Sequence, residues 1–156
     1  MVKKLIFSGF LSLVIFMQVT FAQVFDDVDI ILHPVSGNIY YIEGRGGNIG
    51  LLHGDDGILL VDDQYAPLTN KITDAIKQLS HQPVRYIINT HMHPDHTGGN
   101  ENFGRLGAMI VGHENVRSQM IKAGYNQTPP FVTFSEDVTF YINDEVVHAF
   151  KVPNAH

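Results

Sequence analysis

The stretch VRYIINTHMHPDHTGGN, residues 84–100, decides the fold. Its first six residues are rich in apolar and β-branched side chains, which predicts a buried strand over Val84–Asn89. A polar, glycine-rich loop follows from Thr90 to Asn100. Loops that leave the carboxyl ends of strands in an α/β sheet are where ligands bind, so we expect a functional site in this loop.

Four side chains that can bind a metal ion lie within six residues of the loop: His91, His93, Asp95 and His96. In an extended loop, residues two apart point to the same side, so His91 and His93 can hold one ion while Asp95 and His96 turn toward a neighbouring position. The pattern therefore predicts two adjacent metal sites. Imidazole and carboxylate ligands suit zinc, with manganese or iron as alternatives.

Short apolar runs separated by glycine and aspartate turns precede this loop. They predict strands at 28–32, 39–42, 49–53 and 58–61. The last of these is apolar at consecutive positions, which is typical of a strand covered on both faces. An apolar stripe at helical spacing (Ile72, Ala75, Ile76, Leu79) predicts an amphipathic helix over 68–80 that packs on the sheet.

The alternation continues after the loop, with a predicted strand at 108–111 and a predicted helix at 114–123. Strands at 138–142 and 146–152 are expected to form a hairpin around Asn143-Asp144-Glu145. Alternating strands and helices predict an α/β fold. The 156 residues are enough for one domain of ordinary size and too few for two.

Composition excludes several classes of function. Sixteen acidic residues against ten basic residues give a net charge of −6, which argues against a nucleic-acid partner, because phosphate binding relies on clustered Lys and Arg. Cysteine is absent, so disulfides, cysteine nucleophiles and thiolate metal ligands are excluded. Nine histidines are the unusual feature of the composition.

The first 22 residues have the three-part pattern of a secretory signal peptide, with two lysines, an apolar run and small residues before the cleavage point. A membrane anchor is the alternative, but the run is shorter than the roughly 20 residues that a spanning helix needs. We therefore expect an exported protein, periplasmic or secreted, with no membrane contact after signal cleavage. As a partner we expect a small-molecule substrate.

These motifs together resemble those of the metallo-β-lactamase superfamily, over nearly the whole chain after residue 22. Members carry H-x-H-x-D-H after an inner strand, an aspartate at the end of an earlier strand and a single histidine much further along. Asp62, which closes ILLVD, matches the aspartate, and His156, which closes VPNAH, matches the distant histidine. The resemblance implies an αβ/βα sandwich, of which the chain holds the N-terminal αβ half and the start of the second half.

The resemblance also implies a ligand set. His91, His93 and His156 would hold the first metal, and Asp95 and His96 would contribute to the second. Asp62 would orient the loop without binding metal. The metal would be zinc, up to two ions in a full-length form. Members continue past the last matched histidine with a further aspartate and histidine, so we expect residues 23–156 to form a C-terminally truncated domain.

The implied function is a zinc-dependent hydrolase. A metal-bound hydroxide would attack an ester-like or amide-like carbonyl, as in a β-lactam, lactone or thioester, and Asp95 would be the catalytic residue that accepts the proton. Two alternatives stay open, an iron-dependent oxygenase on the same fold and a metal-binding fragment without turnover.

Two further expectations concern the rest of the chain. His113 ends a predicted strand on the side of the sheet where the site is expected, but matches no ligand of the family. The consecutive apolar residues at 58–61 and 86–88 would lack cover on one face if the second half is missing. We therefore expect an exposed sheet face there and self-association through it.

Overall fold

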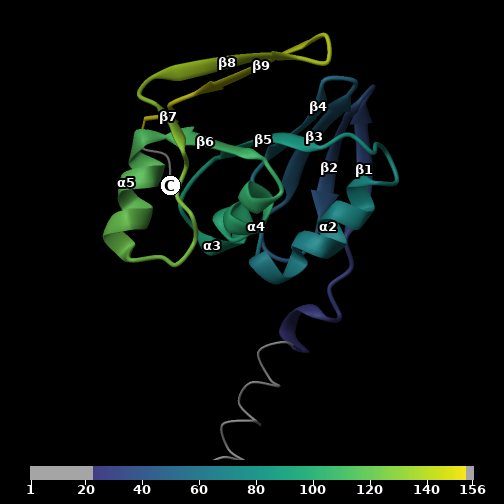
Figure 1. Cartoon of the computed structure of the whole chain (residues 1–156), viewed down its shortest axis with the longest axis horizontal. Helices are drawn as coiled ribbons and strands as arrows, with labels where there is room; N and C mark the ends of the chain where they lie inside the picture. The colour runs from purple at the N-terminus through teal and green to yellow at the C-terminus, as the bar shows by residue number, and fades with distance from the viewer. Residues whose placement is uncertain (1–22, 154–156) are drawn as a thin grey trace, which may run out of the picture.

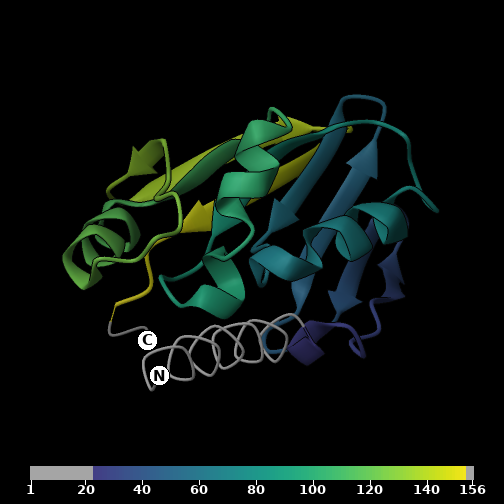
Figure 2. The same cartoon turned by 60° about the horizontal axis from the view of Figure 1, so that its bottom comes forward.

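The computed structural model describes residues 23–153. The predicted signal peptide, residues 1–22, and the predicted ligand His156 lie outside the described residues. The described part of the chain has three layers, with helices on one face of a seven-stranded sheet and a two-stranded hairpin on the other (Figure 1, Figure 2). Within residues 23–153, no helix combines the length and apolar character needed to cross a membrane.

The strands of the large sheet lie in chain order, antiparallel from β1 to β4 and parallel from β4 to β7. They are β1 (Ile31–Ser36), β2 (Ile39–Glu43), β3 (Ile49–Gly54), β4 (Gly57–Val61), β5 (Val84–Asn89), β6 (Met109–His113) and β7 (Val132–Phe134), and the hairpin is β8 (Asp137–Ile142) and β9 (Glu145–Phe150). The helices are η1 (Gln23–Phe25), η2 (Ala66–Leu68), α2 (Thr69–Ile76), α3 (Pro94–Thr97), α4 (Asn100–Arg105) and α5 (Glu114–Ala123). The predicted α/β fold is confirmed.

The central strand β4 has cover on both faces. Leu60 faces the helices and packs in the main core with Ile72 of α2 and Phe103 of α4. Side chains alternate along a strand, so the neighbouring Leu59 faces the other way and packs with Ile142 of the hairpin. Burial of each such side chain contributes about 1.5–3 kcal/mol to folding.

The expectation of an uncovered face at 58–61 and 86–88 is therefore wrong, because the hairpin covers these strands. Leu59 is 2% exposed and Ile88 is 5% exposed. The hairpin has exposed apolar side chains on its outward face, where Tyr141 pairs with Val146 and Phe150 follows along β9. Self-association of the chain stays a prediction.

Several predicted elements differ from the observed ones. The strand predicted at 28–32 begins at Ile31, because Val28 and Ile30 pack on the core without strand pairing. The helix predicted over 68–80 ends at Ile76, where the chain tightens into a turn in which the amides of Gln78 and Leu79 bond to carbonyls three residues back. The short elements α3, α4 and β7 were not predicted. Helix α5 spans the predicted residues.

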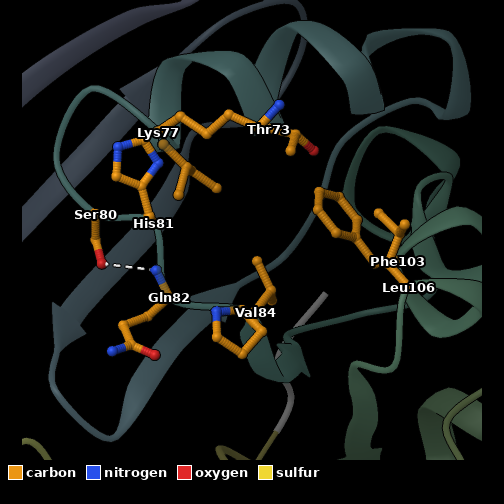
Figure 3. A pocket seen from close by; sticks show the side chains of 10 residues that line it. Thr73, Lys77, Ser80, His81, Gln82, Val84, Phe103 and Leu106 are labelled. Atoms are coloured by element: carbon orange, nitrogen blue, oxygen red, sulfur yellow. Dashed lines mark hydrogen bonds between the residues drawn. The ribbon is translucent and has the colours of Figure 1, made fainter.

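A pocket of about 200 Å³ lies between the end of α2 and α4 (Figure 3). Its lining includes Lys77, His81, Val84 and Phe103. Val84 is the first residue of β5, whereas the histidine-rich loop follows the last one. The pocket therefore lies at the opposite end of this strand from the predicted metal site.

The hairpin is anchored to the sheet at its turn. The amide of Asp56 donates to Asn143 Oδ1 at 2.9 Å, and the amide of Asn143 donates to Asp56 Oδ2 at 2.7 Å. Asn143 Nδ2 also donates to the carbonyl of Gly57 at 2.9 Å. Both turn residues, Asn143 and Asp144, have left-handed backbones (φ +57° and +60°), which two-residue hairpin turns require.

We expect Asn143→Gly to destabilise the fold, because it keeps the left-handed turn but removes two side-chain hydrogen bonds to the β3–β4 turn. The free energy of unfolding, measured by urea denaturation, should fall by about 1–3 kcal/mol. The exposed neighbour Asp144 gives a matched control, since Asp144→Gly should change the free energy of unfolding by less than about 0.5 kcal/mol. Equal losses in the two variants would show that stability depends on the conformation of the hairpin turn and not on its hydrogen bonds to the β3–β4 turn.

Candidate metal centre

The candidate site lies where two neighbouring parallel strands end. Val61 of β4 is opposite Ile88 of β5 in the register. The amide of Asp62 donates to the carbonyl of Ile88 at 2.9 Å, which carries the pairing one residue past β4. The histidine-rich loop therefore begins directly beside Asp62.

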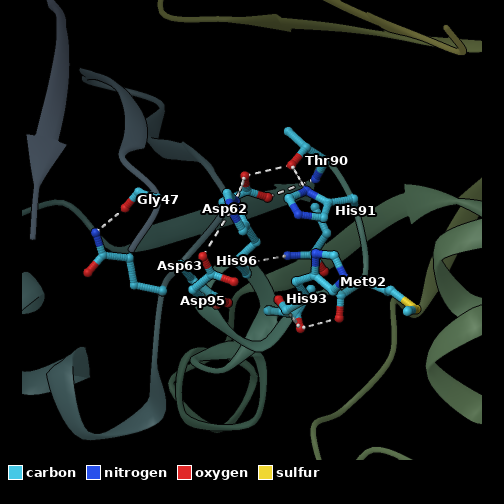
Figure 4. A network of polar contacts seen from close by, with 12 residues as sticks. Gly47, Asp62, Asp63, Thr90, His91, Met92, His93, Asp95 and His96 are labelled. Carbon is cyan, nitrogen blue, oxygen red and sulfur yellow. Dashed lines mark hydrogen bonds and ion pairs between the residues drawn. The ribbon is translucent and has the colours of Figure 1, made fainter. Parts of the chain in front are cut away.

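The Asp62 carboxylate accepts three hydrogen bonds from the loop (Figure 4). Oδ1 accepts from the Thr90 amide at 2.8 Å, and Oδ2 accepts from the Thr90 hydroxyl and from His96 Nδ1, each at 2.7 Å. The side chain is 5% exposed, and the backbone is left-handed with φ +67°. One buried carboxylate therefore ties both ends of the ligand sequence to the end of β4.

This contact selects the tautomer of His96. Donation from Nδ1 leaves the lone pair of the neutral ring on Nε2. Nε2 lies 3.5 Å from Asp95 Oδ2. The hydrogen bond to Asp62 raises the pKa of His96, and burial of the ring works against it. The ring atom that remains for a metal ion is thus Nε2.

The three imidazoles of the loop lie together. The ring centroids of His91 and His96 are 4.0 Å apart, and those of His91 and His93 are 4.9 Å apart with nearly perpendicular rings. One donor atom from each of Asp62, His91 and His96 lies within 4.8 Å of the other two. Of the predicted ligands, this group contains His91 and His96, and imidazole donors of this kind suit a divalent transition metal.

The structure changes one argument made from the sequence. The loop is extended at His93 (φ −66°, ψ 148°) but then forms the helical turn α3. Asp95 and His96 therefore project from a helical turn and not from an extended chain. The division of ligands between two metals, and the part of His156, which lies outside the described residues, stay predictions.

A buried amide pair closes the base of the loop. Asn89, the last residue of β5, donates to Asn100 Oδ1 at 3.1 Å, and Asn100, the first residue of α4, donates to Asn89 Oδ1 at 2.9 Å. Asn100 also donates to the carbonyl of Thr128 at 2.7 Å. Sequence reasoning missed this pair, and the asparagines at the two limits of the predicted loop were its only signal.

Two glycines after the ligands let the loop approach the segment that follows Asp62. A Cβ on Gly98 would lie 2.7 Å from the carbonyl oxygen of Gln64, and one on Gly99 would lie 2.9 Å from that of Asp63. Both distances are too short for a real Cβ, so only glycine permits this packing. The amide of Gly99 donates to Gln64 O at 3.0 Å and to Asp63 Oδ1 at 2.8 Å.

His113, the other histidine near this edge, has a structural role. Its Nδ1 accepts from the Asn115 amide at 3.0 Å and caps α5, and its Nε2 donates to the carbonyl of Ser135 at 2.7 Å. Both ring nitrogens are used within the fold, so nothing here assigns His113 to the metal centre.

The comparisons with other proteins agree with this fold. The model of the metallo-β-lactamase superfamily matches residues 34–153. The chain belongs to this superfamily, as the resemblance in the sequence predicted.

Two solved structures and one curated protein are similar to the chain. A metallo-β-lactamase from Pontibacter korlensis has a TM-score of 0.64 and 25% identity, covering 77% of this chain and 59% of that one. A subclass B3 metallo-β-lactamase of Bradyrhizobium japonicum has a TM-score of 0.66 and 23% identity, covering 80% of this chain and 53% of that one. A coenzyme F420H2 oxidase from Methanothermobacter marburgensis is 35% identical over 63 residues, 38% of this chain and 16% of that protein. The chain thus spans less than two thirds of each.

Asp63 lies beside the centre in a different environment from Asp62. Its Oδ2 is buried and has no hydrogen-bond partner within residues 23–153. Burial raises the pKa of Asp63 well above its usual value, the hydrogen bond from Gly99 opposes this, and the charge of Asp62 adds to it. A carboxyl group whose pKa is higher in the folded state than in the unfolded state stabilises the fold while it is protonated. This contribution is fully present below the pKa of the unfolded state and is lost as the pH rises through the pKa of the folded state.

Asp63→Asn should therefore gain stability relative to the wild type as the pH rises above about 4, because it keeps the acceptor for Gly99 and does not titrate. The measurement is urea unfolding of the metal-free chain at a series of pH values from below to above about 4. The exposed Asp27 provides a control, and Asp27→Asn should follow the wild type throughout. Parallel stability curves for Asp63→Asn and the wild type would contradict this account of Asp63.

Proposed function

We propose that this chain carries the metal centre of a zinc-dependent hydrolase that cleaves an ester-like or amide-like bond. The observation that supports it most is the hydrogen bond from His96 to Asp62, which leaves Nε2 beside Asp95 and among the other loop imidazoles. His91, His93, Asp95 and His96 would hold the metal, with His156 as the further ligand. The arrangement resembles the carboxylate–histidine pairs that orient metal ligands in other proteins.

Asp62 and Asp95, the two carboxylates of this proposal, take different roles. Asp62 is buried and already accepts three hydrogen bonds, so it positions ligands and is poorly accessible to water. Asp95 has a side chain that is 29% exposed, so water can reach it. Asp95 is therefore the group proposed to orient water and accept its proton.

A bound metal ion would supply a Lewis acid for the substrate carbonyl and lower the pKa of bound water. The substrate class proposed is a β-lactam, lactone or thioester. The likeness to the Pontibacter metallo-β-lactamase supports a substrate of this kind. We also propose export to the periplasm or medium, from the pattern of residues 1–22, and N-terminal sequencing of the mature protein tests it by a start at Gln23.

The chain is expected to bind zinc in a tight site, measured by isothermal titration. His93→Ala should lower the affinity by about a hundredfold or more, because it removes a ligand and not only a supporting contact. His148 is a matched control on the hairpin, where it faces Asp137, and His148→Ala should bind zinc as the wild type does. Unaltered binding by His93→Ala would argue against the proposed ligand set.

Turnover is tested on the zinc-loaded chain with a reporter β-lactam, a lactone and a thioester. Asp95→Asn should lower kcat for the accepted substrate by about 10²–10⁴-fold, which is typical of losing a general base. His148→Ala should retain the wild-type rate. Zinc binding without turnover of any of the three would favour a non-catalytic metal-binding fragment.

An iron-dependent oxygenase or oxidase is the second candidate. The similarity to the coenzyme F420H2 oxidase favours it, and the same imidazole and carboxylate donors can hold iron. Elemental analysis of protein purified without added metal separates the two candidates. Iron together with oxygen uptake in the presence of a reductant would support the redox function, and zinc without uptake would support the hydrolase.

A further inference from the structure

Gln64 is a fully buried polar residue directly after the acidic pair that ends β4. Its backbone is in the left-handed region, with φ +57°. This conformation is unfavourable for a residue with a long side chain, and it persists only where the surrounding contacts determine it. The contacts of the Gln64 side chain therefore determine its conformation.

The Gln64 carboxamide binds the loop between β2 and β3, residues 44–48. Nε2 donates to the carbonyl of Gly47, a bond drawn in Figure 4, and Oε1 accepts from the amide of Arg45 at 3.3 Å. A Cβ on Gly44 would lie only 2.5 Å from Oε1, so the loop backbone packs directly on the carboxamide. Gln64 uses both its donor and its acceptor on this one loop.

The same loop lies against two of the candidate ligands. A Cβ on Gly46 would lie 2.8 Å from Asp95 Cβ, and one on Gly47 would lie 2.7 Å from His96 Nε2. A real Cβ does not approach so closely, so glycine lets the main chain touch both side chains. The loop thus forms a wall of main chain beside Nε2, the atom of His96 that remains for a metal.

We propose that Gln64 is a positioning residue for the metal centre, which holds loop 44–48 against Asp95 and His96 and so restricts both side chains to their metal-binding orientation. The inference rests on the proposed function, because it concerns the same metal centre. A glutamate at this position would direct an oxygen at the Gly47 carbonyl and could not donate to it. A leucine would leave both loop groups without their partner.

Two variants test this role with measurements other than activity. Gln64→Leu keeps the bulk and loses the hydrogen bonds, whereas Gln64→Asn keeps the amide but is one methylene too short. In the metal-free chain, both should increase hydrogen exchange of the loop amides of Gly46 and Gly47. Both should also lower zinc affinity by about tenfold to a hundredfold. Ile72→Val, buried in α2, controls for lost stability and should change neither quantity.

A third variant reaches the same contact from the loop. Gly47→Ala places a Cβ against the His96 ring without altering the Gln64 side chain, and should weaken zinc binding to a similar extent. In combination with Gln64→Leu the losses should be less than additive, because both act through one contact. Faster exchange with unchanged zinc affinity in all three variants would overturn the positioning role and leave the metal centre intact. Failure of the wild-type chain to bind zinc would instead overturn the proposed function, and the positioning role with it.

Discussion

Asp62 ends a buried strand, and its carboxylate accepts three hydrogen bonds from the loop that follows the neighbouring strand. Burial of an unpaired carboxylate costs several kcal/mol, whereas a hydrogen bond to a charged group contributes about 1.5–3 kcal/mol. Three such bonds are enough to offset the burial, so Asp62 is a stable anchor for the loop. The rest of the site depends on this contact, because it fixes Thr90 at the start of the loop and the ring of His96 at its end.

Main-chain contacts support this arrangement from outside. Lys71 of α2 donates to three carbonyls of the segment 25–28, which fixes the segment to the helix. Arg45 donates to the carbonyl of Val24 and lies 5.6 Å above the ring of Phe25, so the segment in turn holds loop 44–48. Gln64 holds the same loop from inside. A continuous set of contacts therefore runs from α2 to the backbone beside His96, and none of its members needs to be a metal ligand.

The sequence predicted the parts of this structure that have a clear period or a clear end. The strands at 58–61 and 84–89 were found from consecutive apolar residues, and α5 from a helical pattern that is capped by His113 and ends before Gly124. The missed elements α3, with four residues, and β7, with three, are too short to show a period. Of the candidate site, the four predicted ligands in the loop followed from their spacing, and Asp62 only from the family resemblance. The buried amides of Asn89, Asn100 and Gln64 were not predictable, because their partners are set by the tertiary fold.

The adjacent acids Asp62 and Asp63 show how strongly the fold decides what a residue does here. The loop presents three donors to Asp62, but only the amide of Gly99 to Asp63, whose second oxygen has no partner in the described part of the chain. Burial raises the pKa of Asp63, and a charge there would also be repelled by Asp62. Burial therefore disfavours a charge on Asp63, whereas the carboxylate of Asp62 is in contact with the imidazole of His96. A cation that binds those imidazoles meets the carboxylate of Asp62, while Asp63 packs under the glycines that close the loop.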